Sequence, residues 1–315
     1  MALLLARHDV ERLLDADALL AALAEGFRAI SADPRVDAPA RSALSAGDKG
    51  SLLTMPGFVP ELQFGTKLVS IFPGNAAAGL PSHQGLIVLM DPATGAVSAL
   101  LDAEHVTAMR TAGAATLAAK LLARPESRVM TILGAGVQGR AHLELMSRHF
   151  ELETVFVASR SRASAEAFAA RDDRVVVADS IEAAVRASDI ICLCSQSAEP
   201  LVLADWVQPG QHISSVGYAP PGGELDPAIA AAHTLFVEAR IAFAPPPAGC
   251  AELRGIDPGR GTELGELLLG LRPGRRAAAE VTVYKAMGHA IEDLVVANLV
   301  HRAAIERSAG RVVDL

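Results

Sequence analysis

The sequence has few aromatic residues, few cysteines and no excess of positive charge. Phe, Trp and Tyr make up 4% of the 315 residues, so few rings are available to stack on nucleic-acid bases. Lysine and arginine number 28 against 36 acidic residues, which gives a net charge of −8. A sequence-independent DNA or RNA binder needs a cationic face that displaces counterions. We therefore expect no nucleic-acid partner.

Long apolar runs are also missing. The N-terminal leucines meet Arg7 too early to form the apolar stretch of a signal peptide, and no run approaches the roughly 18 apolar residues of a membrane helix. The three cysteines, Cys192, Cys194 and Cys250, form an odd set without a C-x-x-C pair. This usage favours free thiols in a reducing compartment, buried as packing residues rather than held as metal ligands or a redox pair. We expect a cytoplasmic protein with no membrane partner and no metal site.

The first third of the chain predicts a small domain with both helices and strands. The length suggests two domains at roughly 100–200 residues each. Residues 9–30 have the apolar spacing of one helix. Residues 35–105 contain short alternating runs broken by turn signals, which indicates a mostly β layer. A further helix is predicted over about 107–123.

From about residue 128 the pattern changes to strands that alternate with helices. Strands are predicted at 128–133, 153–158, 174–178, 189–194, 211–216 and 234–238, with helices at 138–149, 163–170 and 180–187 between the first four. Nearly continuous apolar strands that alternate with helices indicate a parallel sheet covered on both faces. Residues 281–307 begin as a strand and become one long helix. The predicted fold is therefore α/β, with a doubly wound domain beside a smaller α+β domain.

The sharpest motif is the run Gly134-Ala135-Gly136-Val137-Gln138-Gly139, which follows a predicted strand and opens a helix. Glycine permits the tight turn at the first position, close approach of a pyrophosphate at the second and helix–strand packing at the third. The helix N-terminus supplies unpaired N–H donors for the phosphates. The next strand follows at the right distance, so we interpret the run as the dinucleotide site of a Rossmann-type domain.

The end of that next strand indicates which dinucleotide binds. An acid there would accept the ribose hydroxyls and favour NAD, but the chain has Ser159-Arg160-Ser161 instead. Arg160 pairs with a 2′-phosphate or stacks on adenine, or it is an ordinary solvated arginine. We favour NADP(H), with NAD(H) as the alternative.

Three cations outside the sheet domain stand out. Arg110 lies in the first turn of the helix predicted from 107, where the dipole disfavours a cation unless an anion is present. Lys67 lies in an apolar strand-like run, and Arg41 stands beside turn-forming residues. Each of the three also fits an ordinary surface cation. Ser82 and His83 add polar groups that either face a ligand or, for the histidine, serve a structural hydrogen bond.

At this point the motifs match a family. The segments GTKLVSIFPGN, GLPSHQGLIVLMDPATG, LLDAEHVTAMRTAGAATLAAKLLARP and ILGAGVQGRAH, with the later VGYAPPGGELD, TELGELLLG and TVYKAMGHAIED, resemble the ornithine cyclodeaminase/mu-crystallin family over about 35–300. The resemblance implies a homodimer. Its substrate-binding and dimerising domain would combine residues 1–115 with 282–315, and the nucleotide domain, 116–281, would be inserted between them.

The resemblance also implies roles for individual residues. By position, Arg41, Lys67 and Arg110 match the family residues that hold the substrate carboxylate at the catalytic site, and Ser82 falls where the family places a hydroxyl near the ligand. The cofactor-binding residues predicted from the two motifs are Gly134, Gly136, Val137, Gln138, Gly139, Ser159, Arg160 and Ser161.

The chain departs from the ornithine cyclodeaminase pattern at informative positions. Cyclodeaminases of the ornithine type carry an aspartate for the substrate amine where this chain has Ala219, and tend to have an acid where it has Leu53. Asp226 or Glu224 would have to substitute. The PSHQ and GAGVQ segments are closer to the mu-crystallin and ketimine reductase branch.

The sequence therefore predicts an NADPH-dependent reductase of a cyclic imino acid, Δ1-pyrroline-2-carboxylate or Δ1-piperideine-2-carboxylate. A protonated imine is already electrophilic, so this direction needs no strong protein base. The alternatives are an ornithine cyclodeaminase, which converts ornithine to proline and ammonia, and an enzyme similar to alanine dehydrogenase. A nucleotide-binding protein without turnover is a fourth interpretation.

Overall fold

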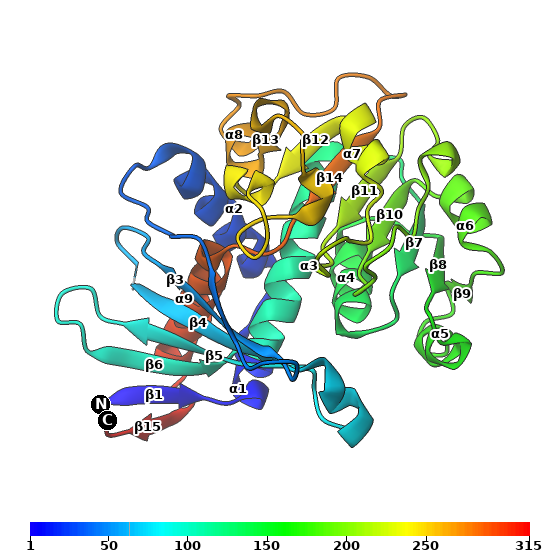
Figure 1. Ribbon diagram of the computed structural model, residues 1–315. Helices are drawn as coiled ribbons and strands as arrows, with labels where there is room; N and C mark the ends of the chain where they lie inside the picture. Colours follow the sequence, from blue (N-terminus) through cyan, green and yellow to red (C-terminus); the bar gives the residue numbers. More distant parts are fainter. Residues whose placement is uncertain (63) are drawn as a thin grey trace. The chain divides into compact units, whose positions relative to one another are not determined.

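The computed structural model describes residues 1–62 and 64–315, and the chain divides into two compact units. Unit 1 contains Met1–Arg110 and His289–Leu315, and unit 2 contains Thr111–Gly288. Each unit is built on its own β-sheet, and all of the strands except β2 are labelled in Figure 1. The α/β architecture predicted from the sequence is confirmed.

Unit 1 contains a seven-stranded sheet in the order β15-β1-β6-β5-β4-β3-β2. The strands are β1 (Ala2–Leu5), β2 (Ser42–Ser45), β3 (Ser51–Gly57), β4 (Phe64–Ile71), β5 (His83–Met90), β6 (Val97–Asp102) and β15 (Arg311–Val313). Strands β2 to β6 form an antiparallel meander, as the alternating runs predicted. Strands β1 and β15 were not predicted. They pair with each other, so the two termini lie side by side (Figure 1).

The N-terminal helical segment is two helices rather than the single helix predicted over 9–30. Helix α1 (Arg7–Leu13) ends at Leu14, and α2 (Ala16–Ala32) begins after Asp15. The Asp15 carboxylate accepts a hydrogen bond from the backbone N–H of Ala18 at 2.9 Å, which caps the new helix. An apolar spacing that continues through both helices conceals this break.

The C-terminal helix α9 (Ala290–Glu306) packs on strands β3, β4 and β5 of unit 1. A pair of opposed glycines, Gly57 and Gly65, lies beneath it. A Cβ on Gly57 would lie 3.1 Å from Leu294 and 3.2 Å from Ile291, and one on Gly65 would meet the carbonyl of Val88. The glycines therefore let the first turns of α9 approach the sheet closely.

Unit 2 contains an eight-stranded parallel sheet in the order β13-β12-β14-β11-β10-β7-β8-β9. The strands are β7 (Val129–Leu133), β8 (Thr154–Ala158), β9 (Val175–Val177), β10 (Ile190–Leu193), β11 (His212–Ser215), β12 (Thr234–Val237), β13 (Thr262–Glu263) and β14 (Thr282–Lys285). The six strands predicted between 128 and 238 are all present. The order runs outward from β7 in both directions, as in a doubly wound fold.

Helices alternate with these strands along the chain. They are α3 (Ala103–Leu122), α4 (Val137–His149), α5 (Arg162–Ala169), α6 (Ile181–Ala187), α7 (Pro227–Ala232) and α8 (Leu264–Leu268). Short 3-10 segments cover Pro73–Ala78, Ala204–Trp206, Arg240–Phe243, Ala251–Leu253 and Pro258–Arg260. Helix α3 is continuous across the boundary between the units at Arg110 and Thr111.

The segment 282–315, assigned from the sequence to the substrate domain, is divided in the structure. Its first strand, β14, pairs with β11 and β12 in the sheet of unit 2, and only the part from His289 onward belongs to unit 1. Strand pairing between distant segments leaves no local signal, so the boundary predicted at 281/282 falls one strand too early. Among residues 1–62 and 64–315, no helix is long and apolar enough to cross a membrane.

Candidate active site

The three predicted cations lie on different elements of unit 1. Lys67 lies in the middle of β4 and is 2% exposed, Arg110 lies on α3 and is 4% exposed, and Arg41 directly precedes β2 and is half-buried. The register of β4 puts Lys67 on the face of the sheet that carries Met55 and Ile87, both buried. A buried ammonium needs a partner, so the prediction that Lys67 is no idle surface cation is consistent with its position.

That partner is Asp293, in the first turn of α9. Its Oδ1 accepts hydrogen bonds from Lys67 Nζ at 2.9 Å and from Arg110 Nε at 3.1 Å, and its Oδ2 forms an ion pair with Lys67 Nζ at 2.8 Å. Glu292, beside it, accepts from Arg110 Nη1 at 3.4 Å, and also from the backbone N–H of His289 at 2.7 Å. The two acids hold the two cations in a fixed arrangement.

We refer to Arg41, Lys67, Arg110, Glu292 and Asp293 as the carboxylate cradle. Arg41 is near enough to depress the pKa of Lys67, so its charge acts on the same point. Three cations and two carboxylates therefore act on one point of unit 1. Cations in such a group can hold a small anionic ligand by charge-assisted hydrogen bonds.

The pKa of Lys67 is lowered to about 8. Burial is the largest cause, Asp293 opposes it, and the positive charges of Arg110 and Arg41 lower it further. For Asp293 itself, burial would raise the pKa, but Lys67 and Arg110 more than offset burial and lower it. Lys67 is thus a cation at neutral pH that titrates within the physiological range.

The predicted polar residues before β5 lie near the cradle. Ser82 Oγ lies 3.1 Å from His83 Nδ1. Burial lowers the pKa of His83, and the positive charge of Lys67 lowers it further. His83 is therefore neutral at pH 7 and close to the cradle. Ser82 lies in the same region, because its hydroxyl contacts the ring of His83.

One argument made for Arg110 from the sequence is wrong. Helix α3 begins at Ala103 rather than near 107, so Arg110 lies two turns inside the helix. The helix N-terminus does not bear on it, and the two acids of α9 balance its charge instead. The sequence analysis missed both acids. Their signal was the adjacent pair Glu292-Asp293 inside an apolar helix, where a buried acid needs a cation.

The predicted dinucleotide site is formed within unit 2 by the turn between β7 and α4. Gly134 has a φ of +124°, and a Cβ there would meet the carbonyl of Cys194. A Cβ on Gly139 would meet the carbonyl of Gly134. Gly136, which caps α4, would meet nothing within 4 Å. The first and third glycines are therefore needed for packing, whereas the second faces open space, as close approach of a phosphate requires.

The side chains at the start of α4 fit a bound dinucleotide. Val137 is 43% exposed although it is apolar. The side-chain oxygen of Gln138 is buried and has no hydrogen-bond partner among the described residues. These residues would hold the cofactor, with the pyrophosphate at the N-terminus of α4.

The chain has no acid at the end of β8. Ser159 is half-buried, and Arg160 is exposed and takes part in no ion pair among residues 1–62 and 64–315. Ser161 caps α5 by accepting a hydrogen bond from the N–H of Ser164 at 3.3 Å. The hydroxyl of Ser161, which was predicted to bind the cofactor, thus serves as the cap of a helix. The side chain of Arg160 can bind an anion.

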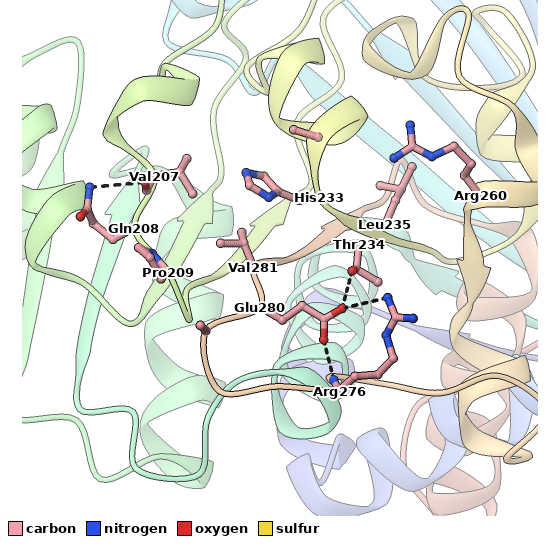
Figure 2. A pocket seen from close by; sticks show the side chains of 12 residues that line it. Val207, Gln208, Pro209, His233, Thr234, Leu235, Arg260, Arg276, Glu280 and Val281 are labelled. Carbon is pink, nitrogen blue, oxygen red and sulfur yellow. Dashed lines mark hydrogen bonds and ion pairs between the residues drawn. The ribbon is translucent and has the colours of Figure 1, made fainter.

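A further pocket of about 600 Å³ lies elsewhere in unit 2 (Figure 2). It lies where β12 and β14 begin, beside Thr234 and Val281. Glu280 accepts hydrogen bonds there from Thr234 Oγ1 and the backbone N–H of Arg276, both at 2.5 Å. Because the strands are parallel, this pocket is at the opposite edge of the sheet from the glycine-rich turn. It is not the dinucleotide site.

Comparison with known proteins assigns the chain. The model of the ornithine cyclodeaminase/mu-crystallin family matches residues 1–308. The chain belongs to this family. The assignment made from the motifs is therefore confirmed.

Proteins with named activities are similar to this chain over most of its length. Ketimine reductase mu-crystallin of Mus musculus is 38% identical over 259 residues, which cover 81% of each sequence. The Δ1-pyrroline-2-carboxylate reductase of Thermococcus litoralis, solved with NADH and L-proline, aligns with a TM-score of 0.93 at 31% identity and covers 99% of this chain and 100% of its own. An archaeal alanine dehydrogenase dimer with bound NAD aligns with a TM-score of 0.89 at 30% identity and covers 99% of each chain.

The structure also places the two acids considered as substitutes for the ornithine cyclodeaminase aspartate. Asp226 caps α7 by accepting from the N–H of Ala228 at 2.8 Å. Glu224 is 1% exposed and is surrounded by protein donors. Ala219 lies in an isolated bridge with Gly222. Within unit 2, both acids already have structural hydrogen bonds.

Proposed function

We propose that this protein is an NAD(P)-dependent oxidoreductase that reduces cyclic imino acids, with Δ1-pyrroline-2-carboxylate and Δ1-piperideine-2-carboxylate as the substrate class. The carboxylate cradle carries the proposal, because its three cations act on one point and fit the acid group that these substrates share. The named activities of the mouse and Thermococcus relatives support the same class of reaction.

Each cradle residue has a distinct task in this proposal. Arg110 and Arg41 hold the substrate carboxylate by charge-assisted hydrogen bonds, and Lys67 completes the clamp. Asp293 fixes the direction of Lys67 and Arg110 before the substrate arrives. Orientation of this kind lowers the activation barrier by several kcal/mol, because translational and rotational entropy is lost on binding rather than in the transition state. The nicotinamide supplies the hydride.

We further propose that NADP(H) is preferred and that NAD(H) is also used. The support is Arg160 at the end of β8, exposed and without an ion pair among the described residues, where an NAD-selective site would carry an acid. The relatives solved with NADH and NAD make the choice of cofactor a separate question from the choice of reaction.

A reaction of the alanine dehydrogenase type is the second candidate, because the archaeal alanine dehydrogenase matches nearly the whole fold. Ornithine cyclodeaminase activity needs a group that takes the substrate amine proton. Ala219 stands at that position, Asp226 caps a helix and Glu224 is engaged by protein donors. These positions favour the reductase over the cyclodeaminase.

One panel of assays tests the function. Purified protein is given NADPH or NADH with Δ1-pyrroline-2-carboxylate, Δ1-piperideine-2-carboxylate, or pyruvate plus ammonia, and NAD⁺ or NADP⁺ with ornithine. We expect oxidation of NADPH with the two cyclic imino acids and no ammonia from ornithine. Ammonia release from ornithine together with inertness toward both imino acids would overturn the proposal. Turnover of pyruvate plus ammonia alone would favour the second candidate.

We also propose a homodimer formed through the outer face of the unit 1 sheet. Helix α9 covers the face that bears Lys67, and the register puts Leu4, Leu52 and Leu44 on the other face. These leucines are 37%, 38% and 70% exposed. Exposed apolar positions on one sheet face mark an interaction surface. A dimeric structural neighbour supports a second copy of the chain as the occupant.

A cytoplasmic location is proposed on the cysteines. Cys192, Cys194 and Cys250 are buried, and burial raises the pKa of Cys192 to about 12 and raises that of Cys194 as well. Thiols of this kind are unreactive packing residues, which suits a reducing compartment.

A further inference from the structure

A second buried group of charges lies within unit 2, at the carboxyl ends of the central strands. Glu224, Glu252 and Lys285 are 1%, 5% and 0% exposed. Lys285 is the last residue of β14, which pairs with β11. We call these three residues the buried triad. Neither the carboxylate cradle nor the glycine-rich turn includes any of them.

Glu224 joins the loops that follow β10 and β11. Its Oε2 accepts hydrogen bonds from the backbone N–H and the hydroxyl of Ser195, both at 2.6 Å. Its Oε1 accepts from the backbone N–H of Gly217 at 2.6 Å and from Ser215 Oγ at 3.1 Å. One carboxylate therefore satisfies four donors on two neighbouring strand ends. This is enough to fix the two loops relative to each other.

Lys285 holds the same loop from the other side. Its Nζ donates to the carbonyl of Gly217 at 2.7 Å and to Ser215 Oγ at 3.1 Å, and forms an ion pair with Glu252 at 2.8 Å. Burial would lower the pKa of Lys285, but Cys250, Glu252 and Glu224 together raise it above its ordinary value. The ammonium is therefore kept charged. Two carboxylates and one ammonium leave the triad with one negative charge.

The sheet order places the triad on one side of the glycine-rich turn. Strand β8, which carries Ser159 and Arg160 at its end, lies on one side of β7, and β10, β11 and β14 follow on the other. A dinucleotide whose pyrophosphate lies at the turn has its adenosine toward β8 and its nicotinamide toward β10 and β11. The loops that Glu224 joins are those at the nicotinamide end.

Burying this many charges costs free energy that an apolar replacement would avoid. Their placement at the nicotinamide end points to a role in the reaction. We propose that the buried triad positions the nicotinamide end of the cofactor site and that its net negative charge stabilises the oxidised, cationic form of the ring over the reduced form. This inference rests on the proposed function, because it assumes a nicotinamide cofactor.

The effect follows from the charge balance of the reaction. The C4–H bond of the reduced ring breaks with its electron pair, and a C–H bond forms at the carbon of the protonated imine. The ring gains one positive charge while the iminium becomes a neutral amine. A fixed negative charge beside the ring favours this redistribution, so the triad makes the bound cofactor a stronger hydride donor.

The experiment measures the dissociation constants of NADP⁺ and NADPH by calorimetry, without an imino acid, for the full chain and three variants. Glu252→Gln removes one negative charge and keeps a similar shape. We expect the ratio of the NADP⁺ to the NADPH dissociation constant to rise about tenfold, because the variant loses a unit of negative charge that attracts the cationic ring. Tenfold corresponds to about 30 mV in the potential of the bound two-electron couple.

Lys285→Gln removes a positive charge, so the ratio should fall. A purely structural role would not move the two variants in opposite directions. Glu280→Gln is the matched control, because it makes the same change at the opposite edge of the sheet, and it should leave the ratio unchanged. If Lys285→Gln does not fold in thermal unfolding, Glu252→Gln alone decides.

An unchanged ratio in folded Glu252→Gln protein overturns the inference, as does a shift of the same sign in both triad variants. Failure of the proposed function gives a different result. Wild-type protein that binds both cofactor forms but reduces no cyclic imino acid removes the substrate assignment and leaves the triad's effect measurable.

Discussion

Asp293 and Lys67 lie 226 positions apart in the sequence, yet the Asp293 carboxylate accepts a hydrogen bond from Lys67 Nζ at 2.9 Å and forms an ion pair with it at 2.8 Å. Both side chains are buried, and Arg110 Nε shares the same carboxylate at 3.1 Å. One acid thus serves as counter-charge for two cations that come from a strand and a helix. The arrangement couples the stability of unit 1 to the geometry of its carboxylate cradle.

Replacing Asp293 by asparagine should destabilise the protein strongly. The change leaves two buried cations without their shared counter-charge, and breaking a buried pair from one side costs about 3–5 kcal/mol. Urea unfolding followed by circular dichroism measures the loss. Glu182→Gln, which breaks the surface pair with Arg186, is the control and should cost less than about 1 kcal/mol. Equal losses in the free energy of unfolding would show that the buried pair is no more stabilising than the surface pair.

Arg110→Ala should lower kcat/KM for Δ1-pyrroline-2-carboxylate by about 10- to 100-fold. A hydrogen bond between charged groups contributes roughly 1.5–3 kcal/mol, and Ala removes it from the substrate carboxylate. Steady-state kinetics measure the effect, and Arg110→Lys should recover part of it because the charge returns. Arg186→Ala, far out on the surface of α6, is the control. A loss under threefold would remove Arg110 from the clamp.

The pH dependence of kcat/KM should report Lys67. Its pKa is lowered to about 8, so the ammonium form dominates below pH 8 and is lost as the pH rises above it. Deprotonation removes the charge of Lys67 from the clamp, so kcat/KM for the imino acid should fall above pH 8, because kcat/KM reports the pKa values of groups in the free enzyme. Lys67→Arg stays protonated throughout and should abolish the break near pH 8. A flat profile to pH 9.5 in the wild type would contradict the assignment.

Arg160→Ala should weaken NADPH much more than NADH. The guanidinium makes a charge-assisted hydrogen bond only where a 2′-phosphate is present, so the ratio of the two dissociation constants should change by about tenfold or more. Fluorescence titration of the reduced nicotinamide measures both constants. Arg162→Ala is the matched control, since Arg162 lies two residues further on and is already paired with Glu166. Equal losses for the two cofactors would remove the case for NADP(H).

Leu44→Asp should disrupt the dimer. Leu44 is 70% exposed on the outer face of the unit 1 sheet, and a charge placed there must be desolvated on association. Light scattering coupled to size exclusion should then show a monomer. Leu271→Asp changes a leucine of unit 2 that is 66% exposed and should leave the mass unchanged. If the wild-type protein is itself a monomer, the proposed dimer is wrong.

The sequence predicted unit 2 well because its signals are local. Each strand of the βα alternation is a short apolar run next to its own helix, and the glycine-rich turn connects β7 directly to α4. Lys67 was also singled out locally, since it interrupts an apolar run. Arg41 and Arg110 were given their roles by the family resemblance, and the local argument for Arg110 was wrong.

The sequence could not predict features that depend on contacts between distant segments of the chain. Strands β1 and β15 come from opposite ends of the chain, and β14 joins a sheet whose other strands lie far earlier in the sequence. Asp293 looked like an ordinary acid in the first turn of a helix, where the dipole alone would justify it. Only the packing of α9 over the Gly57 and Gly65 pair brings it to Lys67.

That packing has a consequence for biosynthesis. Lys67 and Arg110 leave the ribosome long before the segment that carries their counter-charge, and until α9 settles on the two glycines they have no buried acid to meet. The cradle is therefore completed only after the segment that carries residue 293 has been synthesised and has packed on the sheet. A polypeptide that ends before residue 293 lacks the shared acid, so its Lys67 and Arg110 have no Asp293 carboxylate to bind.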